Sequence, residues 1–185
     1  SHLNSFSTVV DEKQEMIGGF ARIKTLIDEQ KEKDPDTLVV DGGDFSMGTL
    51  VQTVFETQAA EIRMLGALGC EATTLGNHEF DYRSKGLAKM LEYGVKDYVM
   101  VQKGDVRVAL LGVFGKDALA CAPTCELQFT DPVEAVKKTV AEIKKNEDAD
   151  IIVCLSHSGT SEDESKSEDE ILAKKVPDLD VIVSA

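Results

Sequence analysis

Residues suited to metal binding occur at three places in the 185-residue sequence, each directly after an apolar run. They are Asp41 and Asp44 in VVDGGD, Asn77, His78 and Asp81 in TTLGNHEFD, and His157 in VCLSHSG. If the apolar runs are strands of an open α/β sheet, their carboxyl ends form one rim where these side chains converge. Carboxylate, amide and imidazole groups together suit a divalent metal harder than those bound by thiolates. The sequence therefore predicts a metal site built from three strand ends.

Each of these residues also has an ordinary structural explanation. An Asp after a strand, such as Asp44, is often a turn or helix-cap residue. Asn77 follows Gly76 and is compatible with a plain left-handed turn. A single histidine is more often packed or exposed than bound to a metal. The occurrence of all three groups at strand ends favours the joint functional interpretation.

The elements that must position these residues alternate along the chain, which predicts an α/β fold. Helical spacing predicts helices over residues 20–34, 51–68 and 87–94, and one that begins after Asp131 with Pro132 and Glu134 in its first turn. Apolar runs predict strands over residues 37–40, 72–75, 98–102, 106–114, 150–156 and 180–184, with a hairpin turn at 103–105.

The composition excludes several classes of protein. A net charge of −14 argues against affinity based on nucleic-acid phosphates, which needs clustered Lys and Arg. It also repels phosphate esters unless bound cations reverse the field locally. No apolar run approaches the roughly 20 residues of a membrane span. No charged-apolar-small leader stands at the start of the given sequence, and the alternative that a signal peptide was cleaved or left out stays open.

The cysteines and one acidic run complete the pattern. Cys70 and Cys154 lie in or beside apolar runs, which predicts small core residues. Cys121 and Cys125 lie in a loop, and three alternatives stay open for this pair: a local disulfide, two free thiols or a pair of metal ligands. The acidic run SEDESKSEDE (161–170) is expected to be a solvated loop leading into a short helix.

Three motifs, in order and on the expected strand ends, resemble one known family. GGDFSMG (42–48), GNHEFD (76–81) and LSHSG (155–159) are similar to the calcineurin-like metallophosphoesterases, and more closely to their 5'-nucleotidase branch. GGFARIKTLI (18–27) is also similar to that branch. The resemblance implies a four-layer α/β/β/α sandwich with mixed sheets, in which residues 1–185 form the catalytic domain.

The resemblance also implies a ligand set and two divalent metal ions, with Mn, Zn, Fe, Co and Mg as the open choices. Asp44 would bridge both ions, and Asn77 and His157 would complete the protein ligands of the second. His78 would stabilise the transferred phosphoryl group or protonate the leaving oxygen, and Asp81 would accept the other ring proton of His78. Water activated by the ions would attack phosphorus in line.

Other residues in these motifs are expected to have supporting roles. Glu79 and Phe80 are interpreted as structural, with Phe80 in the core and not a base-stacking platform. Asp41 is interpreted as a turn residue or as a support for the ligands.

The sequence departs from the family pattern in three places. The family's D-x-H motif on the first strand and its final G-H-x-H motif are both absent, and VIVSA (181–185) stops where the latter would begin. Only residues 95–97 separate the third predicted helix from the next strand, where the family usually has a further strand and loop. We therefore expect that segments were cut, deleted or left out, and that these 185 residues alone are inactive.

The implied function is hydrolysis of phosphate esters of nucleotides or related small molecules. The expected partners are such an ester and a C-terminal substrate-binding domain in the parent protein, with no nucleic acid and no membrane span. The resemblance also implies an exported or cell-surface bacterial protein. Two alternatives stay open: a same-family hydrolase with a diphosphate or thio-ester substrate, and a non-catalytic metal-binding or acidic interaction domain.

Overall fold

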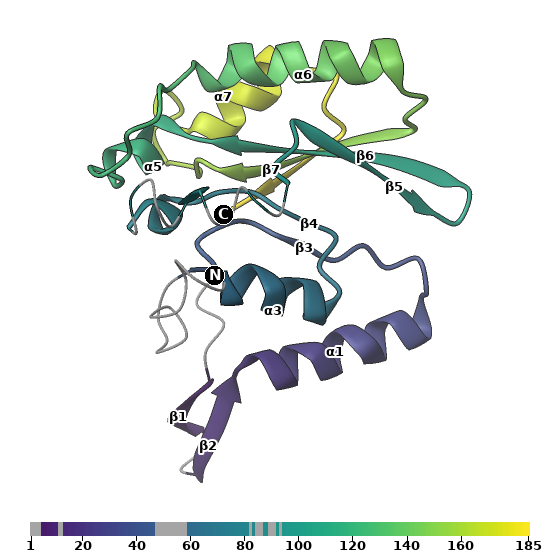
Figure 1. The fold of residues 1–185 in the computed structure, drawn as a ribbon, viewed down its shortest axis with the longest axis vertical. Coiled ribbons are helices and arrows are strands. Elements are labelled where there is room, and N and C mark those ends of the chain that lie inside the picture. Colours follow the sequence, from purple (N-terminus) through teal and green to yellow (C-terminus); the bar gives the residue numbers. More distant parts are fainter. Residues whose placement is uncertain are drawn as a thin grey trace.

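The protein is a mixed α/β fold in which a two-stranded sheet packs against a four-stranded sheet (Figure 1). The computed structural model describes residues 5–10, 13–46, 59–81, 83, 87–88, 92 and 94–185. Among the described strands, β1 (Ser5–Val10) and β2 (Lys13–Gly18) form a separate antiparallel hairpin. The sequence did not predict this hairpin, because β2 is mostly exposed and lacks a regular apolar alternation.

The four-stranded sheet has the order β5-β6-β7-β8. Its strands are β5 (Tyr98–Lys103), β6 (Val106–Phe114), β7 (Ile151–His157) and β8 (Val181–Ser184). The β5–β6 pair is antiparallel, and β6, β7 and β8 run parallel to one another. The predicted hairpin between β5 and β6 is confirmed, as are all four strands predicted in this half of the chain.

Helices α6 (Pro132–Asn146) and α7 (Glu168–Lys175) cover one face of this sheet (Figure 1). Alternate strand residues such as Ala109, Leu111 and Cys154 pack against Val140 and Ile143 of α6. The predicted start of α6 is confirmed, since the Asp131 carboxylate accepts hydrogen bonds from the next helix amides at 3.1 and 3.3 Å. A short helix, α5 (Lys116–Ala120), follows β6.

The opposite face of the sheet packs against β3 (Val40–Asp41) and β4 (Ala72–Thr73), which pair in parallel. Val108, Leu110, Val153 and Leu155 form this core with Leu38, Val40 and Ala72. The strands predicted over 37–40 and 72–75 are therefore right in place but wrong in extent. Thr37 is held in a turn after α1, where its amide and hydroxyl both donate to the Asp34 carbonyl.

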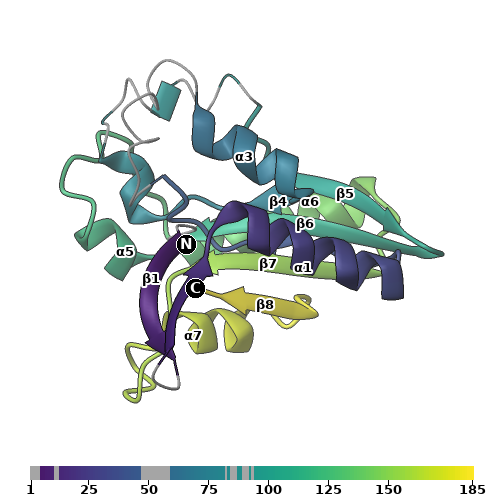
Figure 2. The same cartoon turned by 90° about the horizontal axis from the view of Figure 1, so that it is seen from below.

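Helices α1 (Phe20–Lys33) and α3 (Ala60–Leu68) lie side by side beneath β3 and β4 (Figures 1 and 2). Their apolar side chains pack with two aromatic residues from the loops after β3 and β4. The helix residues are Phe20, Ile23, Ile27, Leu65 and Leu68, and the two aromatic residues are Phe45 and Phe80. The predicted helix over 20–34 is confirmed, as is the last part of the one over 51–68. Residues 51–58 and half of the predicted helix over 87–94 (residues 89–91 and 93) lie outside the described residues.

The cysteines are free thiols. Cys154 is fully buried and Cys70 half-buried, and burial raises the pKa of both thiols, to about 12 and about 11. Cys121 is exposed and Cys125 half-buried, so of the three alternatives for this pair the structure has free thiols. In the part of the chain that the structure describes, no helix has the length and apolar character needed to cross a membrane.

Glu61, in the first turn of α3, is a buried carboxylate at 3% exposure. Among the described residues, neither of its carboxylate oxygens has a hydrogen-bond partner. Burial raises its pKa, and the negative charge of Glu79 adds to the effect. Stability from the protonated form is therefore present below the unfolded pKa and is lost as the pH rises through the folded pKa.

We expect Glu61→Gln to raise the free energy of unfolding at pH 7 by about 1–2 kcal/mol, because a neutral amide costs less to bury than an unpaired carboxylate. The gain should shrink toward zero near pH 4, where both states bind the proton. Urea unfolding at the two pH values measures it, with exposed Glu29→Gln on α1 as the matched control. A gain independent of pH would show that charge burial is not the cause.

Candidate metal centre

Two glycine-containing loops, after β3 and after β4, approach each other more closely than side chains would allow. A Cβ on Gly43 would lie 2.8 Å from the Gly76 amide nitrogen, and one on Gly76 would lie 2.2 Å from Asp44 Oδ1. Gly43 has φ 91° and Asp44 has φ 57°, a left-handed conformation that Asp tolerates better than most residues. The GGD and GN motifs therefore bring the Asp44 carboxylate next to the Gly76 backbone.

Glu79 joins these two loops from inside. It lies in the 3₁₀ helix η2 (Asn77–Phe80) and is fully buried. One carboxylate oxygen accepts the amides of Asp44 (2.8 Å) and Gly76 (2.6 Å), and the other accepts the Ser46 amide (3.0 Å). Three charge-assisted hydrogen bonds compensate for the burial of this charge. The sequence interpretation of Glu79 as structural did not identify this link, because the contacts with Asp44 and Ser46 come from residues 35 and 33 positions earlier.

His157 reaches the Asp44 loop from the other sheet. It is the last residue of β7, and its Nε2 lies 3.3 Å from Asp44 Oδ2. Its Nδ1 donates a hydrogen bond to the Gly42 carbonyl at 2.7 Å. The prediction of one shared sheet rim is thus wrong, since β3 and β4 belong to one sheet and β7 to another. The groups still meet, because the two sheets pack face to face.

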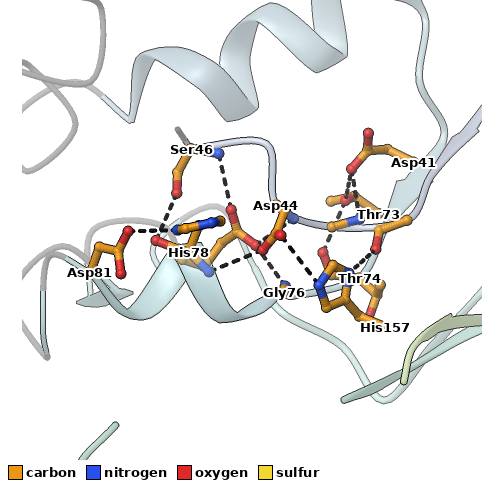
Figure 3. A network of polar contacts seen from close by, with 12 residues as sticks. Asp41, Asp44, Ser46, Thr73, Thr74, Gly76, His78, Asp81 and His157 are labelled. Carbon is orange, nitrogen blue, oxygen red and sulfur yellow. Dashed lines mark hydrogen bonds and ion pairs between the residues drawn. The ribbon is translucent and has the colours of Figure 1, made fainter. Parts of the chain in front are cut away.

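His78 and Asp81 form a second pair beside Asp44 (Figure 3). His78 Nδ1 lies 2.8 Å from Asp81 Oδ2, and the two side chains are 26% and 47% exposed. The His78 backbone amide donates to Asp44 Oδ1 at 3.0 Å, and its carbonyl accepts from Ser46 Oγ at 3.0 Å. Figure 3 shows Asp44 between this pair and His157.

The other predicted residues lie around this centre. Asn77, the first residue of η2, is half-buried directly between Gly76 and His78. Asp41 accepts from the Gly43 amide and from Thr73 Oγ1, both at 2.9 Å, as a turn or supporting residue would. Phe80 is buried against Phe114, with ring centroids 5.2 Å apart, so it is a core residue.

The charges of Asp44 and His157 are strongly coupled. Burial alone raises the pKa of Asp44, but the hydrogen bonds from His157 and the His78 amide, with both imidazole charges, outweigh it and bring the pKa to about 2. The hydrogen bond to Asp44 raises the pKa of His157 against the opposing effect of burial. Shifts in these opposite directions are those of an ion pair between the Asp44 carboxylate and a protonated His157 imidazole.

These residues fit a divalent cation. Because His157 Nδ1 carries the hydrogen bonded to Gly42, the lone pair of a neutral imidazole lies on Nε2, which points toward Asp44 Oδ2. Two lone-pair atoms facing each other at this distance require a positive charge, either a proton or a metal ion. A carbonyl that fixes the other ring nitrogen is the usual support for a metal-binding histidine. Within the described residues no three His, Cys, Asp or Glu side chains cluster as a metal site, so an amide such as Asn77 would be needed.

One apolar cavity is separate from this centre. It has a volume of about 530 Å³ and lies beside β4, lined among others by Phe45, Leu65, Thr74 and Phe114. Neither Asp44 nor His157 lines it. The polar centre therefore lies outside the apolar cavity.

Comparison with known protein families assigns the chain to a family. The family described as calcineurin-like phosphoesterase matches residues 2–185. The chain belongs to this family. Two curated relatives of this calcineurin-like phosphoesterase are an apyrase of Aedes aegypti, 31% identical over 98% of this chain, and a probable 5'-nucleotidase of Treponema pallidum, 29% identical over 91%. The chain covers 36% and 31% of those two relatives, about a third of their length.

Solved structures of two bacterial nucleotidases show the same fold. A 5'-nucleotidase precursor from Thermus thermophilus matches with a TM-score of 0.82 and 28% identity, over 100% of this chain and 39% of that one. An NAD nucleotidase from Haemophilus influenzae matches with a TM-score of 0.76 and 25% identity, over 100% of this chain and 40% of that one. The suspected relation to the 5'-nucleotidases is confirmed.

Proposed function

We propose that this chain is the metal-binding catalytic domain of a phosphoesterase that hydrolyses phosphate esters of nucleotides or related small molecules. The observation that carries the proposal is the contact between Asp44 Oδ2 and His157 Nε2, with the His78–Asp81 pair beside it. Family membership and relatives named as nucleotidases and apyrases support the substrate class. We also propose that the helices and the two packed sheets form the four-layer α/β/β/α sandwich of this family.

The protein ligands in this proposal are Asp44, Asn77 and His157. Bound divalent cations would supply Lewis-acid activation of the phosphate ester and of water, and would offset the negative charge of the chain. Glu79 holds the Asp44 and Gly76 loops together, so that the carboxylate and the amide-bearing residue stay adjacent. The Gly42 carbonyl holds the His157 ring in the tautomer that leaves Nε2 for coordination.

His78 would act on the phosphoryl group itself. Asp81 engages Nδ1, which places the transferable proton of the ring on Nε2 and stabilises the imidazolium. A protonated His78 would stabilise charge on the phosphoryl oxygens or protonate the leaving oxygen. Its partial exposure at 26% is compatible with reaching a bound substrate.

A phosphate-release assay on the complete protein that contains this chain tests the proposal. With manganese and a panel of nucleoside mono-, di- and triphosphates, we expect turnover on the order of 10 per second for at least one substrate. Removal of metal with a chelator should abolish the activity, and added manganese should restore it. Manganese binding without turnover on any of these esters would instead favour the non-catalytic alternative.

A further inference from the structure

Two residues of the acidic run 161–170 are buried, Ser167 and Asp169, although the prediction of a solvated loop that leads into a short helix is confirmed. Asp169 lies in the first turn of α7 and is 5% exposed, whereas residues 161–166 are all exposed. One of its carboxylate oxygens accepts from Ser156 Oγ at 2.5 Å, and the other accepts from Ser184 Oγ. Burial of this charge costs free energy, which the hydrogen bonds to the carboxylate must offset.

The two serines are neighbours across two parallel strands. Ser156 of β7 and Ser184 of β8 are register partners. Both lie on the helix-facing side of the sheet, two residues beyond Cys154 and Ile182, which pack in the core beneath the helices. One carboxylate therefore ties together the carboxyl ends of two strands.

Ser158 extends this network. Its hydroxyl lies 3.0 Å from Ser156 Oγ. Because Ser156 has a single hydroxyl proton and gives it to Asp169, Ser158 is the donor in this contact. The residues on both sides of His157 are thus tied to the Asp169 carboxylate, directly or through one hydroxyl.

The ends of β7 and β8 in turn fix the Asp44–His157 pair. His157 follows Ser156, so its side chain lies on the opposite face of the sheet, toward Gly42 and Asp44. The Ser156 carbonyl accepts from the Ala185 amide at 2.9 Å. A Cβ on Gly42 would come within 2.4 Å of the Ala185 Cβ, so the chain after β8 lies against the residue whose carbonyl orients His157.

We propose that Asp169 is a positioning residue for the metal centre. By holding Ser156 and Ser184 it fixes the ends of β7 and β8, so that His157 keeps its hydrogen bond to Gly42 and presents Nε2 to Asp44. The expected effect of Asp169 on metal binding rests on the proposed function. Its effect on the His157 ring does not depend on that function.

Two variants of the complete protein test the proposal without emptying the core. Asp169→Asn keeps the shape but replaces one acceptor oxygen with an NH₂ group, and Ser184→Ala removes one of the two hydrogen bonds. Glu162→Gln, an exposed residue of the same run, is the control with the same change of charge. Manganese is the probe, at a temperature where circular dichroism shows all proteins folded.

We expect both variants to weaken manganese affinity by roughly tenfold, the lower end of the effect of groups that orient metal ligands. In the metal-free proteins, NMR should show roughly tenfold faster exchange of the His157 Nδ1 hydrogen, since the bond to Gly42 opens more often. Glu162→Gln should change neither value.

The measurements separate the two hypotheses. Absence of manganese binding by the wild type would overturn the proposed metal centre, and the His157 exchange rate would then decide on Asp169 alone. Unchanged exchange in both variants would overturn the positioning role. Lower melting temperatures with unchanged exchange and unchanged affinity would overturn it as well, because Asp169 would then only stabilise the fold.

Discussion

Replacement of His78 with alanine in the complete protein should lower kcat by about two to four powers of ten while metal content stays close to that of the wild type. The loss is that of a positioned proton donor or charge stabiliser. Metal should remain, because the contact of His78 with Asp44 is made by its backbone amide, which alanine retains. Phosphate-release kinetics and metal analysis of the purified variant measure the two effects.

Asp81→Asn is the matched variant for the same pair. An amide in place of the carboxylate removes the charge that stabilises the His78 imidazolium but leaves the side-chain volume and the histidine in place. We expect a smaller loss of kcat than for His78→Ala and a change in the pH profile of kcat. If His78→Ala emptied the metal site, His78 would be a ligand and the role proposed for it wrong.

The sequence predicted the elements that carry a strong local signal. Asp131 with Pro132 marks the start of α6, and a segment that is apolar apart from Arg107 and Gly112 marks the nine-residue strand β6. The short strands β3 and β4 were predicted in the right place but too long. Only two residues of each strand form a pairing, and their apolar neighbours pack in the core without pairing. An apolar run predicts that its residues are buried. It does not show whether they pair as a strand or only pack against the other sheet.

The groups of the candidate centre could be predicted as a set but not in their arrangement. Asp44 and His157 were expected to meet on one rim, and they meet between two sheets. The links made by Glu79 and Asp169 join residues 13 to 35 positions apart, so no local pattern could show them. Asp169 in particular stands in a run of charged residues that are exposed or partly exposed, and only the fold distinguishes it from them.

Asp44→Asn should lower the affinity of the complete protein for manganese by at least about 100-fold, the upper end of the effect of groups outside the ligand set. Asparagine has almost the same size, and its oxygen can still accept from the His78 amide. It lacks the negative charge and the second oxygen that faces His157 Nε2. The change therefore removes the proposed carboxylate ligand with little change of shape.

Asp41→Asn is the control, with the same change of charge three residues earlier, at the end of β3. Asp41 bonds the Gly43 amide and Thr73 Oγ1, so its replacement should change manganese affinity much less. Thermal unfolding with and without manganese gives a second measurement, since an ion at about 100 times its Kd stabilises the folded state by about 2.7 kcal/mol. The wild type and Asp41→Asn should show this stabilisation, and Asp44→Asn should lack it. Equal losses in both variants would mean that the overall negative charge of the loop, and not coordination by Asp44, holds the ion.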